Sequence, residues 1–206
     1  MQQRISPVEP TRLDPGARTR WSRRRVLRAG ATLGALTFPY LLGGRWQLLT
    51  PRQAQAAGAA RRVLTDRQAR LLELLAECLV PGARDAGIVP YLDAQLAADP
   101  AETLLILRYL DVSPPYLPFY DKALRAFRQA AGMQEEDTLP TPAAAERVIA
   151  AIMHGEAVAW ASDAPPASFF FFVLRADAID VTYGTPEGFA RLGIDYVPHI
   201  PPARPW

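Results

Sequence analysis

The chain has 206 residues, half of them hydrophobic, with 23 Lys and Arg against 21 Asp and Glu and a formal net charge of +2. Residues 1–56 hold 10 of the basic residues and only two acidic ones, so residues 57–206 carry 13 basic and 19 acidic residues, a formal net charge of −6. The basic excess therefore belongs to the leading segment and gives no reason to expect a nucleic-acid partner. The remaining length fits one domain rather than two.

A paired arginine is the first motif along the chain. Ser22, Arg23, Arg24 and Leu27 fit the pattern of a twin-arginine export signal, with Val26 where Phe is more usual. A basic patch beside an ordinary helix is the alternative interpretation. The motif predicts a periplasmic protein that the twin-arginine translocase exports in a folded state.

An apolar stretch over residues 29–44 follows the arginines. It contains Pro39 and ends at Arg45, so it is shorter than the roughly 20 apolar residues that a membrane-spanning helix needs. Ala54 and Ala56, with Gln55 between them, then offer a small-residue cleavage site. We therefore expect residues 1–56 to be a signal peptide and leader that are removed, rather than a retained anchor.

Residues 57–181 have the pattern of a helical domain. Thr65 and Gln68 form a capping box, and leucines at helical spacing follow until Pro81-Gly82. Start and stop signals repeat along the segment. They predict about six helices: 65–80, a short helix from residue 90, a helix from residue 100 to about 110, then 117–131, 141–153 and 167–181.

The last of these helices begins with four consecutive phenylalanines, Phe169, Phe170, Phe171 and Phe172. Four consecutive side chains on a helix point in four directions, so a small domain has difficulty covering all of them. An exposed aromatic patch usually marks an interaction site, while a fully internal core helix is the alternative. The run is a candidate partner interface.

Residues 182–206 alternate aromatic and turn residues and end in a proline-rich stretch that suits neither a helix nor a central strand. They predict an extended tail that lies along its own domain or along a partner. Tyr183, Phe189, Tyr196 and Trp206 are its candidate contact residues. The expected fold is mainly all-α, a small irregular bundle of about six helices with this tail.

Chemistry-bearing residues are sparse. Cys78 is the only cysteine, and His154 and His199 are the only histidines. A single cysteine excludes an internal disulfide, and the chain alone does not offer the ligands for a metal ion, an iron–sulfur cluster or an attached haem. The sequence also lacks a glycine-rich phosphate loop and a nucleophile elbow. We therefore predict no cofactor site and no catalytic residue in this chain.

Several segments resemble one known family, the small subunit (subunit 3, or gamma) of gluconate 2-dehydrogenase-like enzymes. The resemblance rests on Leu64-Thr65, Val80-Pro81-Gly82-Ala83, Ala86-Gly87, Tyr91-Leu92-Asp93, the phenylalanine run and, most specifically, YGTPEGFARLGIDYVPHIPP from Tyr183 to Pro202. It implies a partner, a large FAD-containing oxidoreductase of the glucose-methanol-choline type. It also implies that a multihaem cytochrome c often completes the complex, and that the large subunit depends on the small one for maturation and export.

The functional prediction that follows is a non-catalytic accessory subunit, periplasmic and tied to the membrane only through its partners. Two rival classes remain open. One is a self-contained periplasmic binding module without an enzyme partner. The other is an enzyme with an uncharacterised site formed by Asp177, Asp180 and His199.

Overall fold

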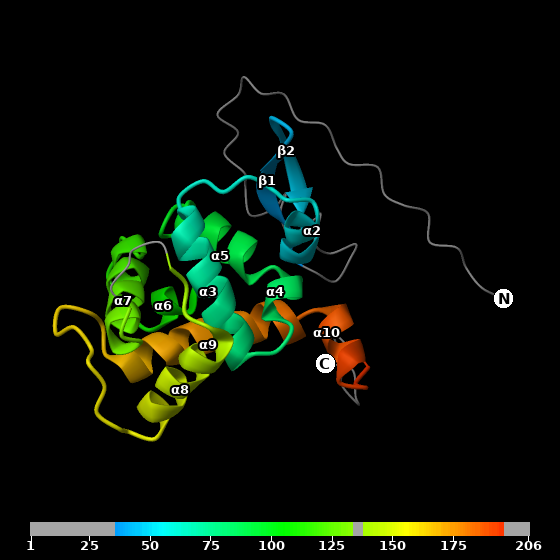
Figure 1. The fold of residues 1–206 in the computed structure, drawn as a ribbon. Helices are drawn as coiled ribbons and strands as arrows, with labels where there is room; N and C mark the ends of the chain where they lie inside the picture. Colours follow the sequence, from blue (N-terminus) through cyan, green and yellow to red (C-terminus); the bar gives the residue numbers. More distant parts are fainter. Residues whose placement is uncertain (1–35, 134–137, 196–206) are drawn as a thin grey trace, which may run out of the picture.

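The computed structural model describes residues 36–133 and 138–195 (Figure 1). Ser22, Arg23, Arg24 and Leu27 of the export motif, and Tyr196 and Trp206 of the tail, lie outside these residues. The described residues form nine helices and one two-stranded sheet, which confirms the predicted, mainly helical fold class. The elements are β1 (Phe38–Leu42), β2 (Arg45–Leu49), α2 (Pro51–Ala56), α3 (Asp66–Leu79), α4 (Ala83–Ala86), α5 (Ile88–Leu96), α6 (Ile106–Tyr109), α7 (Leu117–Ala130), α8 (Pro142–Met153), α9 (Ala167–Tyr183) and α10 (Pro186–Arg191).

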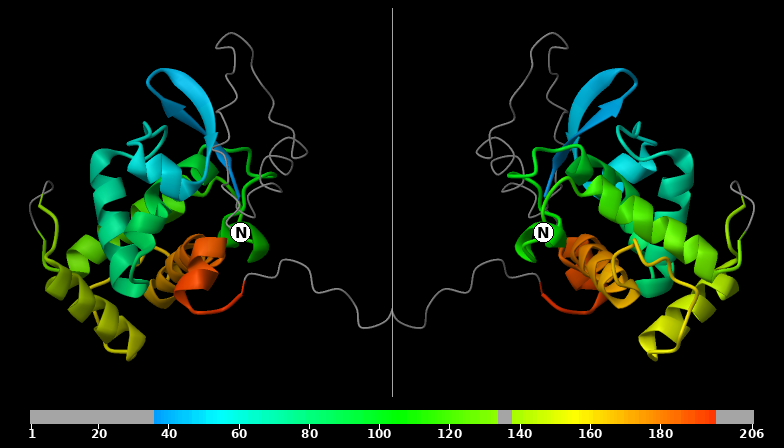
Figure 2. Two further views of the ribbon diagram at one scale, coloured as in Figure 1. Left: turned by 90° about the vertical axis from the view of Figure 1, so that its right-hand side faces the viewer. Right: turned by 90° about the vertical axis from the view of Figure 1, so that its left-hand side faces the viewer.

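The helix α9 is the centre of the fold. It contacts α3, α4, α5, α6, α7, α8 and α10, and the side views of Figure 2 show helices above it and beside it. Phe170, Phe171, Val173, Leu174 and Ala178 on its inner sides are buried. A helix that is apolar on nearly all sides is expected to be surrounded in this way.

The four longest predicted helices correspond to α3, α7, α8 and α9. The capping box of α3 is present: Gln68 N–H donates to Thr65 Oγ1 at 3.3 Å, and Thr65 N–H donates to Gln68 Oε1 at 2.7 Å. The predicted short second helix corresponds to α5, which begins earlier, at Ile88. Gly87 takes a left-handed φ of 87° just before it, and Pro90 then lies in the first turn, where its missing N–H costs no helical bond.

The predicted third helix was wrong in length, because only α6 is helical there. The side chains of Gln95, Thr103 and Asp177 accept hydrogen bonds from the backbone N–H groups of Leu104 (2.7 Å), Leu105 (3.3 Å) and Ile106 (3.1 Å). Backbone donors that bond to side chains are not available to the carbonyls of a preceding helical turn. The segment from Thr103 to Leu105 therefore stays extended, and the helix starts only after it.

The segment that the sequence assigned to a signal and leader forms regular secondary structure from residue 38 onward. β1 and β2 form an antiparallel hairpin in which Phe38 pairs with Leu49 and Leu42 with Arg45. α2 follows, capped by Thr50 in a second capping box with Gln53. This hairpin and α2 lie at the opposite end of the molecule from α8 (Figures 1 and 2).

The expected extended tail is corrected for its first part. Thr182 and Tyr183 continue α9, and α10 follows immediately. Thr185 caps α10 by accepting a hydrogen bond from Gly188 N–H at 3.0 Å, and Pro186 occupies the first helical position. The short sequence Thr-Pro-Glu-Gly is therefore a helix start rather than a turn in a tail. Within the described residues, no helix has the length and apolarity needed to cross a membrane.

Candidate functional site

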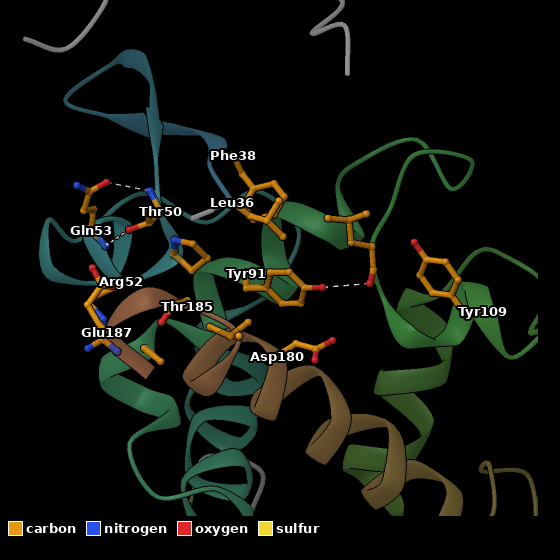
Figure 3. A pocket seen from close by; sticks show the side chains of 15 residues that line it. Leu36, Phe38, Thr50, Arg52, Gln53, Tyr91, Tyr109, Asp180, Thr185 and Glu187 are labelled. Atoms are coloured by element: carbon orange, nitrogen blue, oxygen red, sulfur yellow. Dashed lines mark hydrogen bonds between the residues drawn. The ribbon is translucent and has the colours of Figure 1, made fainter. Parts of the chain in front are cut away.

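A pocket of about 530 Å³ lies between the N-terminal segment, α5 and the junction of α9 with α10 (Figure 3). Phe38, Tyr91 and Val181 contribute apolar surface to its lining. The N-terminal segment also contributes Arg52, while α9 and α10 contribute Asp180 and Glu187. The pocket thus combines an apolar wall with one cation and two carboxylates.

Two contacts set the shape of the apolar wall. The rings of Phe38 and Tyr91 meet edge to face, with centroids 5.8 Å apart and an interplanar angle of 68°. The Tyr91 hydroxyl donates to the Leu104 carbonyl at 3.1 Å, as the dashed line in Figure 3 shows, and burial raises the pKa of Tyr91 above its usual range. A tyrosine fixed and kept neutral in this way serves packing rather than proton transfer.

The charged side chains of the pocket differ in their environments. Burial raises the pKa of Asp180, and the Nη2 atom of Arg52 is buried without a hydrogen-bond partner among the described residues. The lining contains no Cys, His, Ser or Lys, but it includes two carboxylates together with Thr and Tyr hydroxyls.

Asp177, one of the residues of the enzyme hypothesis, faces the core rather than the pocket. Its carboxylate is fully buried and accepts hydrogen bonds from Ile106 N–H at 3.1 Å and from the Tyr120 hydroxyl at 3.2 Å. Burial raises the pKa of Asp177 to about 7, although both hydrogen bonds act to lower it. The carboxyl joins α9 to α6 and α7 and serves the packing of the helices. His199, the third residue of that hypothesis, lies outside the described residues.

The phenylalanine run is divided between the core and the surface. Phe170 is 0% exposed and Phe171 is 1% exposed, and their rings contact each other in a tilted arrangement with centroids 5.1 Å apart and an interplanar angle of 60°. Phe169 is partly buried against Phe119. The prediction that all four rings face a partner is therefore wrong for Phe170 and Phe171, because the surrounding helices cover them within this chain. Phe172, with 48% of its surface exposed, faces outward.

Phe172 belongs to a stripe along the outer side of α9. Ile179, which is 40% exposed, lies two turns further on, and the partly buried Tyr183 follows one turn later. Residues at spacings of seven and four share one side of a helix. We call Phe172, Ile179 and Tyr183 the α9 outer stripe. Of the predicted contact residues, the structure thus places Phe172 and Tyr183 together and adds Ile179.

The two glycines of the Tyr183–Gly188 motif occupy positions where a side chain does not fit. A Cβ atom on Gly184 would lie 2.5 Å from the Asp180 carbonyl oxygen, and one on Gly188 would lie 2.4 Å from the Thr182 carbonyl oxygen. Only glycine allows the two backbones to approach so closely. The motif therefore folds α10 back against the end of α9, where Phe189 is half-buried.

Sequence reasoning did not predict the part of the pocket that residues 36–53 form. Gly43 and Gly44, both with positive φ, separate two apolar runs, which is a signal for a hairpin. Thr50 followed by Pro51 and Gln53 is a capping box that announces a helix. Ala54, proposed as part of a cleavage site, is fully buried in that helix, and Ala56 is its last residue. Among the described residues, no group of three or more His, Cys, Asp or Glu side chains is arranged to hold a metal ion.

A small helical domain whose buried polar groups hold its own helices together, and whose outer surface carries an apolar stripe, has the character of a subunit. The comparison with protein families gives this class a definite identity. Residues 66–201 match the family described as Gluconate 2-dehydrogenase subunit 3. The chain belongs to this family, and its name makes the chain a subunit of a dehydrogenase complex. No curated protein and no solved structure matches the chain.

Proposed function

We propose that this chain is the non-catalytic small subunit of a periplasmic, FAD-dependent dehydrogenase of the glucose-methanol-choline type, which oxidises a sugar, an alcohol or an acid. In this proposal the large subunit binds FAD and performs the chemistry, and a multihaem cytochrome c can accept the electrons. The small subunit helps the large subunit to mature and carries it through the twin-arginine translocase. Membership of the subunit 3 family is the observation that carries the proposal.

The paired arginines supply the second support. If the large subunit is exported folded and bound to this chain, Arg23 and Arg24 are the only export motif that the complex needs.

In a host with an intact twin-arginine translocase, we would co-express this chain with a flavin oxidoreductase encoded beside it. The pair Arg23→Lys and Arg24→Lys should leave the flavoprotein in the cytoplasm, while the unaltered pair yields it in the periplasm. Export of the flavoprotein without the arginines contradicts the carrier role.

The α9 outer stripe is our candidate for the contact with the large subunit. Its rings and aliphatic side chain lie on the exposed side of α9, which also carries Arg175, so a substitution there changes the surface without opening the core. Large apolar side chains left on a surface favour contact with a partner. The stripe is therefore a better candidate than the whole phenylalanine run.

The interface is tested by Phe172→Asp and Ile179→Asp in the co-expressed complex. Each should lower recovery of the flavoprotein with a tagged small subunit, since a charge would have to be buried in an apolar contact. The matched control is Met153→Asp, because Met153 is 57% exposed and belongs to α8 rather than to the stripe. Unchanged recovery with both stripe variants, or an equal loss with the control, excludes the stripe as the interface.

The pocket of about 530 Å³ favours a second candidate, the self-contained periplasmic binding module. The two candidates differ in what accompanies the exported chain. A binding module elutes from size-exclusion chromatography as a monomer with no flavin absorbance, whereas the subunit elutes in a larger complex that absorbs near the flavin bands.

A further inference from the structure

Residues 36–60 pack against the helical domain and contribute Phe38, Tyr40 and Ala54 to its core. Phe38 and Tyr40 are 8% and 4% exposed, and Phe38 packs edge to face on Tyr91 of α5. Beyond α2, Ala60 N–H donates to the Leu41 carbonyl at 3.0 Å, which ties the end of the segment back to the hairpin. The segment is therefore part of the core and not an appendage.

Gly87 shows that the domain is shaped to receive this segment. A Cβ atom on Gly87 would lie 2.2 Å from the Pro51 carbonyl oxygen and 2.9 Å from the Arg52 backbone nitrogen. Such distances are far below van der Waals contact, so α2 reaches its position only because residue 87 has no side chain. The start of α2 and the start of α5 are thus fitted to each other.

The small-residue sequence at Ala54, Gln55 and Ala56 is placed where a peptidase cannot use it. A peptidase binds its substrate in an extended form, and proteolysis favours exposed, weakly bonded segments. Ala54 is fully buried inside α2, and Ala57 N–H donates to the Gln53 carbonyl at 3.0 Å. Gln55 Nε2 also donates to Glu73 Oε1 on α3 at 3.0 Å. The three residues before the Ala56–Ala57 bond are therefore held in helical geometry, and Ala57 caps the helix.

A cut after Ala56 would also remove six of the fifteen residues that line the pocket. It would detach Phe38, Arg52 and the remainder of the segment, and it would expose the face of Tyr91 on which Phe38 packs. We infer that residues 36–60 stay in the mature, folded protein, and that any cut that releases the twin-arginine motif falls before Leu36. This inference replaces the cleavage expected after Ala56. It rests on the packing of this chain alone and not on the proposed export of a partner.

Hydrogen exchange on the purified full-length chain tests the inference directly. The amides of Ala54, Ala57 and Ala60 should exchange within about tenfold of those in the middle of α3, because they would open together with the core. Exchange at the rate of an unstructured peptide, with α3 still protected, overturns the inference.

A pair of glycine variants makes the test specific. Gly87→Ala should speed exchange in residues 36–60 by at least about tenfold, because its methyl group would push α2 away from α5. Gly132→Ala is the control, since Gly132 has a similar positive φ of 69° but nothing within 4 Å of the added methyl group. If both variants change the exchange of the segment equally, α2 is not fitted to residue 87 and the argument fails.

The processed form is read from protein recovered from the periplasm. Intact mass and tryptic peptides should show the peptide from Gln53 to Arg61, which spans the Ala56–Ala57 bond, in the same amount as peptides of α3. A chain that begins at Ala57 overturns the inference. If the chain is not in the periplasm at all, the export proposal fails, and the exchange experiment still decides whether the segment belongs to the fold.

Discussion

The carboxyl of Asp177 should make this protein less stable as the pH rises from 4 to 8. Burial raises the pKa of Asp177 from 3.8 to about 7 in the folded chain. Between these values the folded protein keeps a proton that the unfolded chain releases, so the free energy of unfolding falls with increasing pH. The stability is fully present below the unfolded pKa and is lost as the pH passes through the folded pKa.

The magnitude follows from the same two values. Each tenfold change in the dissociation constant of the proton corresponds to about 1.4 kcal/mol. The ionised carboxyl therefore costs about 4 kcal/mol at pH 8, of which about 2 to 3 kcal/mol develops between pH 5 and pH 8. Asp177→Asn removes the titration and can keep both hydrogen bonds, because Oδ1 still accepts from Ile106 N–H and the new amide can donate to the Tyr120 oxygen.

Urea unfolding at pH 5, 6, 7 and 8 measures the effect. From pH 5 to pH 8, the free energy of unfolding of the variant relative to that of the unaltered protein should rise by about 2 to 3 kcal/mol, since all other titrating groups are common to both proteins. Tyr120→Phe keeps the carboxyl and removes one bond to it, so the decline with pH should persist in that variant. Parallel pH profiles for Asp177→Asn and the unaltered protein would refute the reasoning.

Three further substitutions separate packing from surface. Phe170→Ala should lower the free energy of unfolding by about 3 to 5 kcal/mol by leaving a cavity, whereas Phe172→Ala should lower it by less than about 0.5 kcal/mol; equal losses in urea would place both rings in the same environment. Gly188→Ala should lower the melting temperature more than Gly193→Ala, because only the first methyl group meets backbone atoms, and the reverse order would contradict the close α9–α10 turn. Asp93→Ala should cost more than about 3 kcal/mol, since three backbone N–H groups donate to this carboxylate; a loss below about 1 kcal/mol in urea unfolding would mean that water replaces it.

The helices that could be predicted from sequence are those determined by local signals. In α3, Thr65 and Gln68 lie three residues apart, and leucines repeat along one side. The capping bonds and the buried face of this helix therefore come from residues that are close together in the sequence, where a local pattern reveals them. The α6 region differs because Ile106 bonds to Asp177, 71 residues away. A bond over such a distance along the chain leaves no local pattern, so the sequence predicted a longer helix than the one that forms.

The candidate site was predictable only in part for a related reason. Four adjacent phenylalanines signal a buried or interacting helix, but which rings face inward depends on where α3, α7 and α8 pack. Phe171 packs edge to face on Phe127 of α7, whereas Phe172 has 48% of its surface exposed. At the other end, the apolar residues after Arg24 satisfy the pattern of an export signal and that of a buried strand equally well. The tertiary contact of Phe38 with Tyr91 of α5 distinguishes the two, and a single sequence does not show it.

The close approach of Gly87 to Pro51 has a consequence for how the family can vary. The family match begins at residue 66, whereas the fold of this chain includes residues 36–65. In a relative without the leading hairpin, the contact with Pro51 and Arg52 is absent, so we expect Asn or Asp, which tolerate a left-handed φ, to be able to replace glycine there. Glycine at position 87 and a Thr-Pro-x-Gln helix start upstream should therefore occur together or be lost together. The pair of features is a signature by which members that keep the leading segment can be recognised.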